Sequence, residues 1–116
     1  MNSIQEIVGL LMDASEPNSN VLKNLASHGD DPKLFREVTF AIEAPSEEQA
    51  NHICGFITDF KYGSPSVSEI DNGYLVEVTI NTPATEEVIS CISGFMLCVA
   101  NFFGGTFNGW GCSAQS

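Results

Sequence analysis

The sequence contains very few positively charged side chains. Of its 116 residues only four are lysine or arginine, whereas 15 are aspartate or glutamate, so the formal net charge is −11. A nucleic-acid-binding protein needs cationic side chains that displace counterions from the phosphates. The composition therefore argues against direct binding of RNA or DNA. An acidic surface instead attracts basic protein segments, although composition by itself favours the simpler explanation that the charge aids solubility.

The side chains that build metal sites and nucleophilic active sites are also scarce. The sequence has two histidines, His28 and His52, and its four cysteines form no C-x-x-C pair. Cys54 is close to His52 in sequence, but on a helix the two side chains point to different sides. A zinc site needs closely spaced ligands, and a nucleophile needs an oriented base. We therefore predict a protein that is not an enzyme, with no metal, no cofactor and free thiols.

No apolar run is long enough to cross a membrane, which takes about 20 residues. The most apolar segment, residues 84–103, is predicted to be a helix that is apolar over about half of its wheel and polar over the other half. The chain begins with an acidic amphipathic stretch instead of a signal peptide, which favours the cytoplasm. Leu97 lies at the centre of the polar half. We expect it to be exposed, either as an isolated leucine or as a partner contact.

In the first half of the chain, the spacing of apolar residues predicts two short helices, a strand and a longer helix. Apolar residues at helical spacing favour a helix over the first dozen residues, interrupted at Pro17, and a second short helix that ends at Gly29. From residue 34 to 44 the period changes to two, which indicates a strand. A capping box from Ser46 to Gln49 then begins a helix that ends near Gly63. Its apolar arc of about 160° contains Ala50, Ile53, Cys54, Phe56, Ile57 and Phe60.

In the second half of the chain, turn residues and apolar spacing predict a hairpin, a helix and a final strand. Residues 67–70 and 74–82 flank Asp71-Asn72-Gly73, whose Asn-Gly pair is typical of a tight hairpin. Thr82-Pro83 provides a cap and a first-turn proline for the helix over 84–103, and residues 106–113 form the last strand. The apolar half of that helix contains Val88, Ile89, Cys91, Ile92, Phe95, Met96, Cys98, Val99, Phe102 and Phe103.

The order strand, helix, strand, strand, helix, strand predicts an α+β fold, a ferredoxin-like βαββαβ sandwich with extra N-terminal helices. Both long helices are expected on one face of a four-stranded antiparallel sheet. We expect a single domain overall, with an N-terminal helical segment over residues 1–28 and the ferredoxin-like part over 29–116. Whether the N-terminal helices cover a sheet edge or the second face is open, and monomer and homodimer both remain possible.

Several short motifs resemble those of one family. They are Gly29-Asp30-Asp31-Pro32, a strand ending in Ile42-Glu43-Ala44, a helix opening with Ser46-Glu47-Glu48, and the segment Phe107-Asn108-Gly109-Trp110-Gly111. In order and spacing they are similar to the ribonuclease E regulator B (RraB) family. The resemblance implies a ferredoxin-like fold. It also implies inhibition of ribonuclease E by binding the scaffold region of that enzyme, which reshapes the RNA degradation complex.

The residues that we expect to contact a protein partner are mostly acidic. Glu37 and Glu77 are predicted on the sheet face away from the long helices, and Asp30 and Asp31 lie in a loop. Trp110 is either an interface anchor or, as we favour, a ring packed over its glycine neighbours at the sheet edge. With Leu97 these residues form the candidate site. The alternative function is a small-molecule sensor of ferredoxin-like fold, which rests on fold analogy alone.

Overall fold

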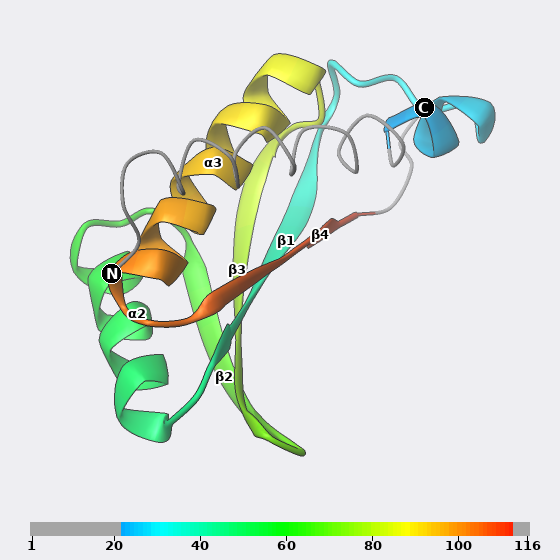
Figure 1. Ribbon diagram of the computed structural model, residues 1–116. Coiled ribbons are helices and arrows are strands. Elements are labelled where there is room, and N and C mark those ends of the chain that lie inside the picture. Colours follow the sequence, from blue (N-terminus) through cyan, green and yellow to red (C-terminus); the bar gives the residue numbers. More distant parts are fainter. Residues whose placement is uncertain (1–21, 113–116) are drawn as a thin grey trace, which may run out of the picture.

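A computed structural model describes residues 22–112 of the chain (Figure 1). The predicted helix over the first dozen residues and its break at Pro17 lie outside this range. Residues 22–27 are helical, as predicted for the second short helix. The remaining elements are β1 (Phe35–Ala44), α2 (Glu47–Asp59), β2 (Ser64–Ile70), β3 (Gly73–Pro83), α3 (Glu86–Phe102) and β4 (Thr106–Gly111).

The four strands form one sheet in the order β2-β3-β1-β4, and every pair of neighbours is antiparallel. Helices α2 and α3 both pack on the same face of this sheet, since their buried residues belong to one hydrophobic cluster with those of β1 and β3. The predicted α+β class and the predicted order of elements are confirmed. The other face of the sheet carries no helix from residues 35–112 (Figure 1).

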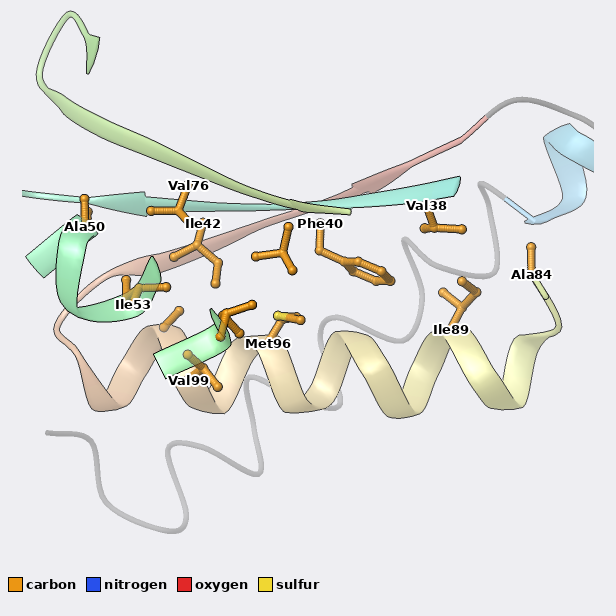
Figure 2. Packing of buried hydrophobic residues seen from close by; sticks show 14 residues of the cluster. Val38, Phe40, Ile42, Ala50, Ile53, Val76, Ala84, Ile89, Met96 and Val99 are labelled. Atoms are coloured by element: carbon orange, nitrogen blue, oxygen red, sulfur yellow. The ribbon is translucent and has the colours of Figure 1, made fainter. Parts of the chain in front are cut away.

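The core lies between the sheet and the two helices (Figure 2). In β1 the fully buried residues are Val38, Phe40 and Ile42, at the period of two that the sequence predicts. Ile53 of α2 and Met96 of α3 meet them from the helix side. Because side chains alternate between the faces of a strand, this register sends Glu37 and the other odd-numbered residues of β1 to the opposite face.

Side-chain caps fix where the two helices begin. The hydroxyl of Ser46 accepts a hydrogen bond from the backbone N–H of Gln49 at 3.2 Å, so the predicted cap at Ser46 is confirmed. The side chain of Gln49 pairs with the same hydroxyl, which donates to Oε1 at 2.9 Å, and not with the backbone N–H of Ser46 as in a full capping box. Gln49 Nε2 also donates to the carbonyl of Phe103 at 3.2 Å, which joins the start of α2 to the end of α3. For α3 the predicted cap at Thr82 was wrong. β3 continues to Pro83, and Thr85 accepts from the N–H of Val88.

The β2–β3 hairpin also differs in detail from the prediction. Ile70 pairs with Gly73, so the turn consists of Asp71 and Asn72, and Gly73 already belongs to β3. The glycine is needed here for two reasons. Its φ is +154°, and a Cβ at this position would lie 2.5 Å from the carbonyl oxygen of Ala44. Gly73 therefore permits a close approach between the hairpin and the end of β1.

Helix α3 is rotated relative to the predicted orientation. Cys91, Cys98 and Phe102 belong to the predicted apolar half but are exposed. Ser93 and Leu97 belong to the predicted polar half but are buried, and Leu97 is only 6% exposed. The expectation of an exposed Leu97 was therefore wrong. Small residues explain part of the rotation, because a face with serine and alanine lets a helix approach its neighbours closely. Periodicity alone does not reveal this choice.

Buried Ser93 leads to a stability prediction. Its hydroxyl has no hydrogen-bond partner among residues 22–112, and burial of an unsatisfied hydroxyl costs free energy. We expect Ser93→Ala to raise the free energy of unfolding by about 1 kcal/mol, since alanine also has the higher helix propensity. Urea denaturation followed by circular dichroism measures this. The control is Ser90→Ala on the same helix, expected within about 0.5 kcal/mol. A destabilised Ser93→Ala variant contradicts the prediction.

Candidate protein-interaction surface

The loop before β1 is held by a buried ion pair. The side chains of Asp30 and Arg36 are 3% and 2% exposed, and Arg36 Nη1 donates to Asp30 Oδ1 at 2.5 Å. The same guanidinium donates to the carbonyl oxygens of Asp31 at 2.7 Å and Leu34 at 3.0 Å. One arginine thus closes the loop onto the start of β1. The carboxylate of Asp30 faces Arg36 and not the solvent, so the structure explains this part of the motif by folding.

The neighbouring Asp31 is exposed, and its Oδ1 accepts a hydrogen bond from the backbone N–H of Lys33 at 3.1 Å. An aspartate that bonds the backbone two residues ahead stabilises a turn. Its second carboxylate oxygen has no hydrogen-bond partner from residues 22–112. Asp31 can therefore meet solvent or a partner, whereas Asp30 cannot do so without opening the loop.

Glu37 and Glu77 lie on the helix-free face of the sheet, as predicted. In the register of β1 and β3, Glu37 is opposite Asn81 and Glu77 is opposite Ala41. Between these pairs the hydroxyls of Thr39 and Thr79 form a hydrogen bond of 3.2 Å. A shallow hollow of about 420 Å³ runs from Glu77 across β1 to the backbone of β4 at Asn108–Gly111. This part of the helix-free face therefore carries two carboxylates and a pair of hydrogen-bonded threonines.

Trp110 is half-buried against the hydrophobic core. It is opposite Phe40 in the register of β1 and β4, just after an irregularity between Ala41 and Ile42. Gly109 has a φ of +108° at this irregularity, a conformation that glycine tolerates. Trp110 also borders the hollow on the helix-free face. Its main contacts are therefore those of a residue that seals the edge of the core.

The most conspicuous exposed feature is a set of aromatic rings where α2 meets α3. We call it the aromatic surface; its members are Phe56, Phe60, Tyr62, Phe95, Phe102 and Phe103. Ring centroids are 5.1 Å apart for Phe56 and Phe60, and 4.7 Å apart for Tyr62 and Phe95. Phe60 is 61% exposed, Tyr62 42% and Phe102 66%. Aromatic pairs at such distances attract each other, so the rings hold one another in place.

An apolar hollow of about 420 Å³ lies at one side of the aromatic surface. Tyr62 and Phe95 form part of its wall, together with Ile80 of β3, exposed Cys91 of α3 and the side chain of Lys61. Lys61 and Tyr62 belong to the loop that follows α2. A hollow of this kind accepts an apolar side chain from a partner protein.

Sequence reasoning missed the aromatic surface because it assigned these phenylalanines to the core. The signal was nevertheless present in the sequence. The predicted apolar arcs of about 160° on one helix and about half the wheel on the other are wider than the roughly 100° stripe that suffices for packing on a core. The apolar residues beyond the stripe that packs on the core, such as Phe60 and Phe102, are the ones that remain exposed in the fold.

Metal binding and nucleophilic chemistry both set requirements for the histidine, cysteine and tyrosine side chains of the described residues. Among residues 22–112 no group of three or more histidine, cysteine or acidic side chains is placed to hold a metal ion. His52 lies beside the ring of Phe103, with centroids 6.4 Å apart. Burial raises the pKa of the Cys112 thiol, against the opposing effects of a hydrogen bond from Arg36 and its charge, so the reactive thiolate is disfavoured. Partial burial and the carboxylates of Glu69 and Glu47 raise the pKa of Tyr74.

The described part of the chain contains no helix that is long and apolar enough to span a membrane. Three of its exposed large apolar side chains, Phe60, Tyr62 and Phe102, belong to the aromatic surface, whereas Leu34, Phe35 and Val67 are exposed elsewhere. A contiguous apolar patch of this kind marks an interaction site. Residues 15–112 match the RraB family, described as regulator of ribonuclease activity B, and the chain belongs to this family. The resemblance noted in the sequence is thereby confirmed. A comparison with curated proteins gives no match. The family consists of regulators of ribonuclease activity and is not defined by a catalytic activity.

Proposed function

We propose that this protein binds ribonuclease E in the cytoplasm and inhibits it, with no catalysis of its own, and thereby modulates the RNA degradation complex. The observation that carries the proposal is an exposed aromatic surface on an acidic member of the RraB family. The partner region is a basic segment of the scaffold part of ribonuclease E. A formal charge of −11 favours a basic protein segment and opposes direct contact with RNA.

The fold that we propose is the ferredoxin-like sandwich, with the N-terminal helical segment over residues 1–28 and the ferredoxin-like part over 29–116. The strand order β2-β3-β1-β4 with antiparallel neighbours supports it, because a βαββαβ chain with both helices on one face produces this order. Monomer and homodimer are both compatible with this proposal. The helix-free face of the sheet is the surface through which a homodimer would form.

The acidic residues in the proposal act mainly through long-range attraction. In this proposal Asp31, Glu37 and Glu77 draw a basic segment toward the protein, which raises the association rate more than it slows dissociation. Their exposure or part exposure to solvent supports this role. The side chains of Asp30 and Leu97 are buried, and Trp110 is packed against the core. We assign these three an indirect role, through the folded shape of the surfaces that they support.

The test combines binding and inhibition. Purified ribonuclease E is titrated with the protein while RNA cleavage is followed, and association is measured between about 0.1 M and 1 M salt, over which the Debye length falls from about 10 Å to 3 Å. We expect inhibition, and binding that weakens as the salt concentration rises. Glu37→Gln with Glu77→Gln should slow association and leave dissociation nearly unchanged.

The matched control removes two charges elsewhere, with Glu69→Gln and Asp71→Asn on the β2–β3 hairpin. If this pair slows association as much as the first, the effect belongs to the net charge and not to the helix-free face. Ribonuclease E that neither binds nor is inhibited overturns the proposed function.

A further inference from the structure

We infer that the aromatic surface between α2 and α3 is the docking site for a basic protein segment that carries arginine and an apolar anchor residue. The inference deepens the proposed function and rests on it for the identity of the partner. It places the main contact on the helix side of the protein, opposite the face that carries Glu37 and Glu77.

The first support is the concentration of exposed aromatic rings. Scattered apolar side chains are normal on a protein surface, but a contiguous patch marks a binding site. Here Phe60, Tyr62 and Phe102 are all exposed, and successive ring contacts link them through Phe56, Phe95 and Phe103, with Phe56 and Phe103 joining the two helices at 5.8 Å. Because the rings are already held in place, a partner loses little free energy in ordering them.

The second support is the apolar hollow beside Tyr62 and Phe95. Interfaces draw much of their affinity from one or a few side chains that fill such hollows, with weaker contacts around them. Lys61 is the one cation among the residues that line it. The partner residue that enters is therefore apolar, and the cationic residues of the partner lie elsewhere on the surface.

The third support is the charge around the rings. Glu48 and Asp59 are exposed and lie on the side of α2 that carries Phe56, by helical spacing. On α3, Glu87 lies on the same exposed row as Cys91, Cys98 and Phe102. A basic partner finds carboxylates at the rim and aromatic faces at the centre. Arginine fits both, since its guanidinium pairs with carboxylates and stacks on aromatic rings.

Charge also decides against the other occupants. A second copy of the chain brings a further formal charge of −11 to the same surface. Residues 1–21 contain Glu6, Asp13 and Glu16 and no lysine or arginine, so this segment does not complement the acidic rim either. RNA is repelled for the same reason. A basic protein segment is the occupant that the charges favour.

The experiment uses two probes with the full-length protein. One is ribonuclease E, and the other is a synthetic helical peptide with leucine and arginine on one face, which tests the chemistry of the surface independently of the partner. The variant is Phe60→Ala with Phe102→Ala, two exposed positions whose replacement should leave the fold intact. We expect it to bind both probes at least tenfold more weakly, which is about 1.4 kcal/mol at 25 °C.

The matched control is Phe35→Ala. Phe35 is 67% exposed, but it lies on the helix-free face of β1, so its loss should not change binding. A second readout uses the exposed thiol of Cys91, which lines the hollow. A bound probe should protect Cys91 from alkylation, whereas Cys112, beside Arg36 and outside the hollow, should keep its rate.

The outcomes distinguish a failure of the proposed docking site from a failure of the proposed function. If the peptide binds through the aromatic surface but ribonuclease E does not bind, the docking site stands and the proposed function is overturned. If ribonuclease E binds equally well to Phe60→Ala/Phe102→Ala and leaves Cys91 unprotected, the docking site is overturned and the function stands. Binding of neither probe overturns both.

Discussion

Replacement of Asp30 by alanine is expected to lower the free energy of unfolding by about 3–5 kcal/mol, the usual cost of removing one member of a buried ion pair. Arg36 remains buried in the variant without its carboxylate partner, although its bonds to the carbonyls of Asp31 and Leu34 persist. The loss of stability is large because the buried guanidinium of Arg36 is no longer hydrated by water and, in the variant, no longer paired with a carboxylate. Urea denaturation followed by circular dichroism measures it.

Two controls define the cause. Asp31→Ala removes the adjacent, exposed carboxylate and should change stability by about 0.5 kcal/mol or less. The double variant Asp30→Ala with Arg36→Met removes both buried charges and should recover much of the loss, since an apolar pair often replaces a buried ion pair without cost. A loss below about 1 kcal/mol for Asp30→Ala means that Arg36 finds another partner or reaches water.

Replacement of Phe40 by alanine is expected to be equally severe, with a loss of about 3–5 kcal/mol. Phe40 is fully buried at the centre of β1, between the sheet and α3 (Figure 2). The variant loses the transfer free energy of the ring and leaves a cavity that Met96 and the surrounding side chains fill only in part. The measurement is the urea midpoint together with the slope of the unfolding transition.

Phe35→Ala is the matched comparison, since it makes the same chemical change on the same strand. Phe35 lies on the other face and is exposed, so we expect a change within about 0.5 kcal/mol. The difference in unfolding free energy between Phe40→Ala and Phe35→Ala directly tests whether side chains of β1 alternate between the buried and the exposed face. Similar losses for both would contradict the assignment of Phe40 and Phe35 to opposite faces of β1.

Local patterns were sufficient to predict most of the fold. The period of two in β1 and the helix cap at Ser46 each involve residues that are near neighbours in sequence, and both are confirmed. The tight hairpin predicted at Asn72-Gly73 is confirmed, but β3 begins at Gly73, one residue earlier than predicted. The cap predicted at Thr82 was wrong, because β3 continues to Pro83. Backbone pairing with β1 and β2 continues there across residues that are not apolar.

The candidate site was less accessible to sequence reasoning. Glu37 and Glu77 were placed on the correct face, because alternation along a strand settles that question. Asp30 was predicted as a partner contact, and its carboxylate instead faces Arg36, six residues away in the chain but brought alongside by the loop. The phenylalanines of α2 and α3 were assigned to the core. Which of them are exposed depends on how the two helices lie side by side.

Composition and local patterns specify the acidic character, the order of the elements, the inward face of β1 and the family to which the chain belongs. Tertiary structure alone decided the rotation of α3, which buried Leu97 and exposed Phe102. It also decided the gathering of rings from two helices into one surface. The physical reason is that periodicity specifies an apolar arc on each helix. The part of that arc that is covered depends on the sheet and the neighbouring helix, which come from distant parts of the chain.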